Sequence, residues 1–401
     1  MQHFPGMVIE GARQVGKSTL ARQIADNDAV IMNLDDEQTR AAAIADPVGF
    51  IRQAGERQLV IDEMQRMPEL TLVVKSEIDN NRIPGRFILT GSARLLRVRG
   101  TADSLAGRVA RLTLYGLSRG ELAQQPDDFI TAIIGNPNSI KDIISDTTRD
   151  SLTKILAMGA YPEIRDYPDR LRNTWIDSYL EGLINRDITE LRSRVDPSRA
   201  LSLLRTIAGR PAAELVKATL AQGSAIPAAT VTSYLDLLHE IGLVVSIPPW
   251  TPNLAKREIG RPKILVTDSG LALRLARMTP AQLSHISNSE SFGAYLEAFV
   301  VTELLKQQGW SDQDYTVFHY RDRDGDEVDI IIELADGFVI GIEVKAASAF
   351  SSKHFSGLIR MRDRLGERFL AGVVLAPVST GYRYADRLFG APIDALWNFL
   401  G

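Results

Sequence analysis

One octapeptide near the amino terminus constrains this chain more than any other feature of its 401 residues. Residues 11–18 read Gly-Ala-Arg-Gln-Val-Gly-Lys-Ser and stand between an apolar segment, 7–9, expected to be a strand, and an expected helix, 17–25. In this context the glycines let successive backbone N–H groups curve around a phosphate, and the helix amino terminus adds partial positive charge. A mere glycine turn would not require Lys17 and Ser18 after the second glycine. The pattern therefore predicts a phosphate-binding loop.

The loop residues can be assigned roles toward ATP and Mg²⁺. We expect Lys17 to bridge the β- and γ-phosphates and to be essential for catalysis, while the Ser18 hydroxyl binds Mg²⁺. The expected nucleotide contacts are Gly11, Ala12, Arg13, Gln14, Val15, Gly16, Lys17, Ser18 and Thr19.

A pair of acids follows the next strongly apolar segment, in Gln-Leu-Val-Ile-Asp62-Glu63. The strand 59–61 delivers Asp62 to the edge of a sheet, where it can hold the water shell of Mg²⁺, and Glu63 can act as general base toward the attacking water. Such a pair alone is often only a solvated strand end, but together with the phosphate loop it indicates hydrolysis. After the strand 86–90, Thr90-Gly91-Ser92 either orients that water or forms a plain turn.

A phosphate in transfer also attracts a cation. Arg108, in Leu-Ala-Gly-Arg, is the candidate arginine finger and Arg94 the second choice, the alternative being that both are ordinary surface residues. An arginine acting from a neighbouring subunit would make activity depend on a homo-oligomer.

A second group of charges lies near the carboxyl terminus. Asp329 is embedded in an apolar segment, Glu343-Val-Lys345 closes the next one, and Asp336-Gly337 between them predicts a hairpin that brings the three together. Asp329 and Glu343 can hold Mg²⁺ while Lys345 activates water for phosphodiester cleavage, and Glu297 on a preceding helix can add a third acid. The alternative is that Glu343 and Lys345 pair across a solvated edge.

The chain as a whole is α/β, and four regions are expected. Alternating strands and helices predict a parallel sheet in 1–125. Residues 126–196 are a polar loop followed by helices, the last over 170–191. Residues 197–262 predict a winged helix-turn-helix, with helices over 212–221 and 229–241, a turn over 222–227 between them, and a strand over 243–247. The fourth region is 263–401. Its expected pattern of elements starts with a helix from 291 to 308, which is followed by three strands and then by a helix, a strand and a helix.

The middle region, 197–262, could contact either DNA or a protein, and the sequence favours neither of these alternatives. Thr230, Thr232 and Ser233 lie on the second helix, where base-reading residues are expected, but 228–240 contains no arginine or lysine. Phosphate contacts would have to come from four basic residues before it, Arg199, Arg205, Arg210 and Lys217.

Composition narrows the remaining classes. The chain has no cysteine, which argues against disulfides and thiolate chemistry, and its five histidines do not cluster, which argues against a histidine-built zinc site. Its net charge of −4 does not indicate a nucleic-acid binder. No apolar run approaches the roughly 20 residues of a membrane span, and no basic and apolar leader precedes the first strand. A cytoplasmic protein without membrane contact is expected.

With these residues in view, the chain resembles a prokaryotic family of AAA+ P-loop ATPases that carry a C-terminal restriction-endonuclease-like, PD-(D/E)XK, domain of unknown function. The resemblance is carried in order by 11–18, 59–63, Ile-Leu-Thr-Gly-Ser at 88–92, Ser-Leu-Ala-Gly-Arg at 104–108, Thr-Asp-Ser-Gly-Leu at 267–271, Glu327-Val-Asp329 and Glu343-Val-Lys345. It implies an AAA+ core, a winged-helix linker and a nuclease-like fold, with ATP and Mg²⁺ as ligands. It also implies that Arg108 is the finger and that Asp329, Glu343 and Lys345 form the metal site. Such proteins usually have a longer amino-terminal lead over the adenine than the six residues before Met7.

Two functions from different classes follow as hypotheses. The first is an ATP-hydrolysing protein that couples nucleotide state to a DNA-directed nuclease-like domain. The second is a nucleotide-switched regulatory module whose nuclease fold is inactive and binds a protein partner. A nucleotide kinase shares the phosphate loop, but the absence of a recognisable lid and the Asp62-Glu63 pair speak against it.

Overall fold

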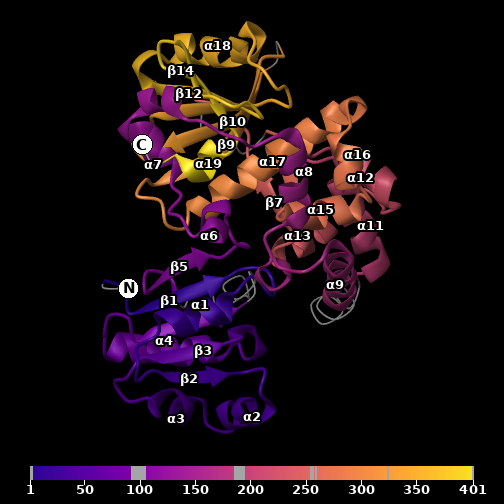
Figure 1. Cartoon of the computed structure of the whole chain (residues 1–401). Helices are drawn as coiled ribbons and strands as arrows, with labels where there is room; N and C mark the ends of the chain where they lie inside the picture. Colours follow the sequence, from indigo (N-terminus) through magenta and orange to yellow (C-terminus); the bar gives the residue numbers. More distant parts are fainter. Residues whose placement is uncertain are drawn as a thin grey trace. The chain divides into compact units, whose positions relative to one another are not determined.

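The structure is a computed structural model that describes residues 3–91, 105–184, 195–252, 257, 260–322 and 325–399. The chain divides into two compact units, one of Met1–Gly116 with Leu237–Leu243 and one of Leu117–Asp236 with Val244–Gly401. Figure 1 labels many of the helices and strands of the two units.

The first unit is built on a parallel sheet with the strand order β2-β3-β4-β1-β5. The expected strands at 7–9, 29–33, 59–61 and 86–90 and the helix at 17–25 are confirmed within a residue or two. Its elements are β1 (Gly6–Glu10), α1 (Lys17–Ile24), β2 (Val30–Asn33), α2 (Glu37–Ala45), α3 (Pro47–Arg52), β3 (Leu59–Asp62), α4 (Leu70–Asn80), β4 (Phe87–Gly91) and β5 (Val109–Thr113).

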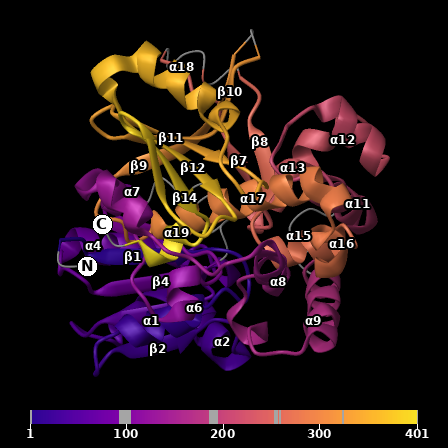
Figure 2. The ribbon, with the colours of Figure 1, turned by 45° about the horizontal axis from the view of Figure 1, so that its top comes forward.

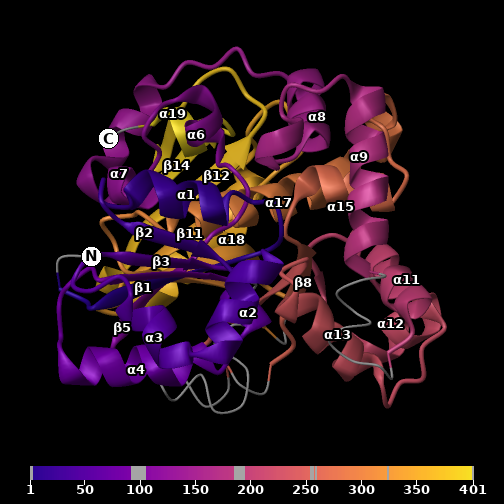
Figure 3. The same cartoon turned by 90° about the horizontal axis from the view of Figure 1, so that it is seen from below.

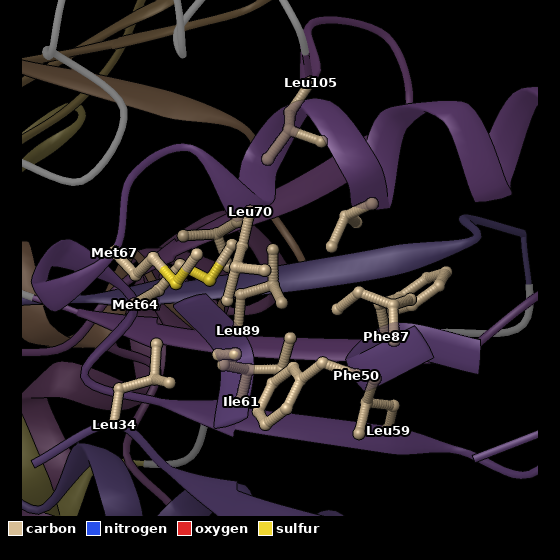
Figure 4. Packing of buried hydrophobic residues seen from close by; sticks show 14 of the residues in the cluster. Leu34, Phe50, Leu59, Ile61, Met64, Met67, Leu70, Phe87, Leu89 and Leu105 are labelled. Atoms are coloured by element: carbon tan, nitrogen blue, oxygen red, sulfur yellow. The ribbon is translucent and has the colours of Figure 1, made fainter. Parts of the chain in front are cut away.

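Both faces of the three central strands, β3, β4 and β1, are largely buried, which explains why these strands are nearly continuous apolar runs. Residues two apart on a strand share a face, so Leu59 and Ile61 pack with Leu89 on one side, against helices that include Phe50 and Leu70 (Figure 4). On the other side Ile9, Val60 and Ile88 pack against Ala21 of α1. Each fully buried large side chain contributes about 1.5–3 kcal/mol, so the core holds the strand ends in fixed positions.

The strand order decides what meets at the carboxyl edge of the sheet. Strand β4 lies between β1 and β3, so the loop after β1, Thr90 near the end of β4 and Asp62 at the end of β3 follow three adjacent strands. In open parallel sheets ligands bind at this edge, outside the carboxyl ends of the strands.

The second unit begins with helices and a small antiparallel sheet of order β6-β8-β7. Helix α11 packs against α12 and β8, as Figure 3 shows. These elements are α6 (Arg119–Ala123), α7 (Phe129–Gly135), α8 (Arg149–Met158), α9 (Asp169–Gly182), α11 (Pro197–Ala208), β6 (Ala213–Glu214), α12 (Lys217–Ser224), α13 (Val231–Glu240), β7 (Val244–Ile247), β8 (Lys263–Val266), α15 (Ser269–Leu275) and α16 (Pro280–Ser284).

Two expectations for this region are corrected. The helix expected over 212–221 does not start until Lys217, because Ala213 and Glu214 pair with Ile264 and Lys263 as strand β6. Cross-strand pairing here outweighs the helix propensity of the alanines. The helix expected over 170–191 is α9, whose regular α-helical part ends at Gly182, and the last residues of that expected range lie outside the described residues.

The carboxyl-terminal part of the second unit is a mixed sheet of order β13-β14-β12-β11-β10-β9. Strands β11, β12 and β14 are mutually parallel and the other pairs are antiparallel. The expected hairpin at Asp336-Gly337 is confirmed, with Gly337 at a φ of 84° that favours glycine. The elements are α17 (Ser289–Gln307), β9 (Tyr315–Arg321), β10 (Glu327–Leu334), β11 (Val339–Val344), α18 (Ser356–Leu365), β12 (Phe369–Ala376), β13 (Tyr382–Ala385), β14 (Leu388–Pro392) and α19 (Ala395–Asn398).

Two helices flank this sheet (Figure 2). Helix α18 lies close against it because Gly341 and Gly372 leave room for Leu358. Helix α17, which has 19 residues, packs on β9 and β11 and carries Glu297. None of the described helices combines the length and the hydropathy that crossing a bilayer requires.

Candidate functional site

The loop between β1 and α1 has a backbone that depends on its glycines. A Cβ on Gly11 would lie 2.1 Å from the carbonyl oxygen of Leu114, so no other residue fits there without a shift. Gly16 has a φ of 105° and precedes α1, whose amino terminus has no side-chain cap and no acid in its first turn. Gln14 also has a positive φ, 62°. The loop thus turns backbone N–H groups and the helix terminus toward one place, as anion binding requires.

Lys17 lies inside this loop. Its side chain is buried, with 5% of the residue exposed, and its ammonium donates a hydrogen bond of 2.7 Å to the carbonyl of Ala12. A buried ammonium held by a carbonyl is readily transferred to a stronger, anionic acceptor such as a phosphate oxygen.

The carboxylate of Asp62, at the end of β3, links helix α1 and strand β4 at the same edge. Its Oδ1 accepts a hydrogen bond from the Ser18 hydroxyl at 2.9 Å and another from the Thr90 hydroxyl. Asp62 and Thr90 are buried. The structure therefore brings together the predicted residues Lys17, Ser18 and Asp62, and it adds Thr90, which the sequence left open between a role and a turn. Ser92 lies outside the described residues.

Glu63 follows Asp62 in a left-handed conformation, with a φ of 58°. Its N–H donates to the Thr90 hydroxyl at 3.2 Å, and its carboxylate accepts a hydrogen bond from the side chain of Gln65. Non-glycine residues in this conformation carry strain that persists only where the surroundings hold it, and such residues concentrate at functional sites. The backbone of Glu63 is thus fixed at the edge while its carboxylate is held by a neighbour.

Arg108 lies at the other end of the sheet from the loop. Strand β5 starts directly after it, and Val109 pairs with Gly6, the first residue of β1, whereas the loop follows Glu10 at the far end. That separation is about 13 Å at the usual rise per residue. The guanidinium makes a two-point ion pair with Asp79, at 2.7 and 3.0 Å, which raises the pKa of Arg108 and lowers that of Asp79. Arg94 lies outside the described residues.

The carboxyl-terminal charges also come together. The hairpin places Asp329 on β10 beside Glu343 and Lys345 at the end of β11. The Lys345 ammonium donates to Asp329 Oδ2 at 3.3 Å and to Glu343, and the N–H of Val344 donates to the same Asp329 oxygen at 2.8 Å.

The predicted third acid, Glu297, has a partner that the sequence interpretation did not include. Lys263, the first residue of β8, donates from its ammonium to Glu297 Oε1 at 2.7 Å and lies 3.3 Å from Glu327 Oε1. Its side chain is 6% exposed. We name these residues the acidic cluster: Lys263, Glu297, Glu327, Asp329, Glu343 and Lys345.

Proximity within the acidic cluster changes the ionisation of its members. Burial and then the charge of Asp329 raise the pKa of Glu297 to about 7, and the same causes raise the pKa of Glu343 well above its usual value. Burial alone would lower the pKa of Lys263, but Glu297, Asp329 and Glu327 outweigh it and raise that pKa to about 12. The two lysines are therefore held as cations among the carboxyl groups.

As arranged, the acidic cluster is not a metal cage. Among the described residues no group of three or more histidine, cysteine, aspartate or glutamate side chains is placed to hold a metal ion. The oxygens of Asp329, Glu343 and Glu297 that Mg²⁺ would use accept hydrogen bonds from lysines instead. The residues that the resemblance assigns to a metal thus lie together, but ammonium groups supply the positive charge.

The middle helices present the residues predicted for DNA or protein contact at the surface. Thr230, Thr232 and Ser233 are exposed, and the Thr230 hydroxyl donates to the carbonyl of Pro227. The four basic residues Arg199, Arg205, Arg210 and Lys217 are exposed as well.

Comparison with known families divides the chain into three matched segments. Residues 3–123 match a family described as an AAA domain. Residues 149–282 match a domain of unknown function (DUF8612), and residues 292–396 match another (DUF4143). Two uncharacterized proteins, of Mycobacterium bovis and Mycobacterium tuberculosis, are each 26% identical over 99% of this chain and 82% of their own length.

Some solved structures show partial similarity to this chain. The Orc1 protein of Aeropyrum pernix in complex with DNA is 14% identical, covers 68% of this chain and 86% of its own, and has a TM-score of 0.23. A RuvB variant of Thermotoga maritima is 19% identical, covers 64% and 84%, and has a TM-score of 0.26. The family match, together with the sheet order and the loop geometry, identifies an AAA-type P-loop ATPase domain at the amino terminus.

Proposed function

We propose that this protein binds and hydrolyses ATP in a Mg²⁺-dependent reaction at the edge formed by β1, β4 and β3. The observation that carries the proposal is that Lys17 donates to the loop carbonyl of Ala12 while its neighbour Ser18 donates to Asp62. Bound Mg²⁺ would supply charge neutralisation at the phosphates. A serine hydroxyl and an aspartate oxygen fit its preference for oxygen ligands, and the lysine fits the phosphate oxygens.

Individual residues of the chain then have separate roles in ATP binding and hydrolysis. Lys17 leaves the Ala12 carbonyl for the phosphates, and the loop N–H groups orient them. Thr90 fixes both the Asp62 carboxylate and the Glu63 N–H. The Glu63 carboxylate accepts the proton of the attacking water.

Steady-state ATP hydrolysis with and without DNA tests this proposal. Lys17→Ala should abolish nucleotide binding and turnover, whereas Glu63→Gln should keep binding and lose about 100-fold or more in turnover, the usual contribution of a general base. Arg22→Ala, which removes an exposed arginine of the same helix, is the matched control. Turnover that survives in Lys17→Ala would contradict the assignment.

For Arg108 we propose a role at the phosphates of a neighbouring copy, because its own loop lies at the opposite edge. Asp79 provides the discriminating control, since Asp79→Ala breaks the same ion pair but leaves the guanidinium. If Arg108 is an arginine finger, Arg108→Ala loses at least about tenfold in turnover while Asp79→Ala does not. Equal effects of the two variants would reduce Arg108 to a structural partner.

We further propose that nucleotide state is coupled to a DNA-directed carboxyl-terminal half. The support is the helices α11 to α13 followed by antiparallel strands, as in a winged helix, and the mixed sheet with Asp329, Glu343 and Lys345 on adjoining strands, as in restriction-endonuclease-like folds. Cleavage of labelled DNA with Mg²⁺ or Mn²⁺, compared between wild type and Asp329→Ala, tests the nuclease part. Product that is unchanged in the variant would count against it.

One observation favours a second candidate, a nucleotide-switched module that binds a protein without cutting DNA. Lysines already satisfy the acidic cluster, which is what a retained but inactive fold would show. ATP binding with no turnover, indifferent to DNA, combined with no cleavage in either metal, would support this candidate.

A further inference from the structure

Lys263 and the two carboxylates that it contacts come from different elements. Lys263 opens β8 in the three-stranded sheet, whereas Glu327 opens β10 of the six-stranded sheet and Glu297 lies on α17. The residue is only 5% exposed, which is rare for a lysine unless it is paired. The pairing is with Glu297 at 2.7 Å and with Glu327 at 3.3 Å.

The backbone around Lys263 is fixed from two sides. Within its own sheet it pairs with Glu214 and Ile247. Two residues earlier, the Arg261 carbonyl lies 3.0 Å from Nε2 of His319 on β9, whose own backbone exchanges hydrogen bonds with Pro248 and Trp250. The lysine is therefore carried to the carboxylates by a strand that hydrogen-bonds to the edge of the larger sheet.

Charge explains why a lysine is tolerated there. The acidic cluster contains four carboxyl groups, and Lys345 contacts only Asp329 and Glu343. Without Lys263, Glu297 and Glu327 would lose their contacts to a cation, and a buried uncompensated carboxylate is costly. A divalent ion would meet the same need, because it binds carboxylate oxygens and brings two positive charges.

We propose that Lys263 is a built-in counter-cation, and that the acidic cluster takes a divalent metal ion only when Lys263 is withdrawn. The inference builds on the location proposed above for metal-dependent chemistry and adds what controls its occupancy. Withdrawal of Lys263 would leave Glu297 and Glu327 without the cation that they contact. In the arrangement seen here the site is closed to metal.

The first test uses Mn²⁺ alone, the full chain and no nucleotide. Free Mn²⁺ is measured by electron paramagnetic resonance as it is titrated into wild type and into Asp329→Asn. The expected result is the same binding curve for both, because the closed cluster contributes no site. A wild-type Mn²⁺ site that disappears in Asp329→Asn would overturn the proposal, whatever happens in the variants below.

The second test removes the ammonium. Lys263→Met should gain a Mn²⁺ site that the wild type lacks, and Mn²⁺ should raise its Tm because metal that binds only the folded state stabilises it. Lys263→Arg keeps the charge and should behave as wild type. The double variant Lys263→Met with Asp329→Asn should lose the gained site, which would locate it in the cluster.

A folded Lys263→Met that binds Mn²⁺ no better than wild type would also overturn the proposal. Should Lys263→Met not fold without metal, folding restored by Mn²⁺ supports the proposal, and Lys263→Gln, which keeps a hydrogen-bond donor toward Glu297, repeats the binding test. These readouts involve neither ATP hydrolysis nor DNA cleavage. Loss of either proposed activity therefore leaves the metal-binding result interpretable by itself.

Discussion

The P-loop site and the acidic cluster both contain lysine and carboxylate side chains, but these side chains have different hydrogen-bond partners in the two sites. At the P-loop, the Lys17 ammonium donates to the backbone carbonyl of Ala12, and the Asp62 carboxylate accepts hydrogen bonds from two hydroxyls. In the acidic cluster, ammonium groups contact carboxylates directly, Lys345 with Asp329 and Lys263 with Glu297.

This difference distinguishes the P-loop site, which can accept a charged ligand, from the acidic cluster, whose charges are already compensated by its own side chains. The hydroxyls of Ser18 and Thr90 give Asp62 hydrogen bonds but leave the charge of its carboxylate to be met by Mg²⁺. In a buried ion pair the two opposite charges compensate each other within the protein, so a charged ligand must first displace one of the two side chains. Equivalent substitutions in the two sites should therefore have different consequences.

The largest expected effect is on stability, from Lys345→Met. It leaves Asp329 and Glu343 buried without their common cation, and breaking one side of a buried pair typically costs about 3–5 kcal/mol. Urea unfolding of the variant against wild type measures this cost. Lys353→Met, at an exposed position nearby, is the matched control and should change little. If Lys345→Met is as stable as its control, the ion pairs of the cluster are not what the structure indicates.

The next effect concerns pH and the support of Lys263. Burial and the charge of Lys263 lower the pKa of His319 to about 4, so the folded protein holds this imidazole neutral while the unfolded chain titrates near 6.5. The neutral His319 side chain contributes its full stabilisation of the folded state at pH values above the unfolded pKa of about 6.5. This contribution, about 3 kcal/mol in all, is lost as the pH falls from about 6.5 through 4.

The difference in unfolding free energy between wild type and His319→Gln, followed from pH 7.5 to 4, isolates this contribution. Glutamine keeps a donor for the Arg261 carbonyl but does not titrate, so the variant should lose less stability on acidification than wild type does. Identical slopes for the two proteins would show that His319 is protonated without cost.

The same lysine-to-methionine change in the P-loop should cost far less stability. Lys17→Met removes a hydrogen bond to the Ala12 carbonyl, worth about 1 kcal/mol, and also relieves the burial of an ammonium. Nucleotide binding, measured by calorimetry with ATP and Mg²⁺, should nevertheless be lost. If Lys17→Met destabilised the protein as much as Lys345→Met does, the proposed difference between the two sites would be wrong.

The strand, loop and helix around the P-loop were predicted well because local patterns determine them. The strand, the glycine loop, the helix and the Asp62-Glu63 pair each leave a signal within a few residues, and parallel strands must bring their carboxyl ends to one edge. The register of the hairpin likewise follows from Asp336-Gly337, so the meeting of Asp329, Glu343 and Lys345 was foreseeable.

What the sequence did not predict is long-range pairing. Lys263 stands 34 residues before Glu297 and in a different sheet, and its only local sign is a charge opening the apolar run Ile-Leu-Val. The pairing of Ala213 and Glu214 with β8 was missed for the same reason, since no pattern within that segment announces its partner. The Arg108–Asp79 pair joins two elements 29 residues apart and was equally invisible.

The smallest expected effect tests how Glu63 is held. Its carboxylate accepts a hydrogen bond from Gln65, which must be given up before the carboxylate can accept a proton from water. A hydrogen bond of this kind contributes about 0.5–1 kcal/mol, so Gln65→Ala should raise ATP turnover by about two- to fivefold with unchanged ATP affinity. The gain must vanish when Gln65→Ala is combined with Glu63→Gln, because it acts through that carboxylate. Unchanged or reduced turnover would mean that Gln65 positions Glu63 for the reaction instead of restraining it, and the P-loop site would then resemble the acidic cluster in being organised by contacts among its own side chains.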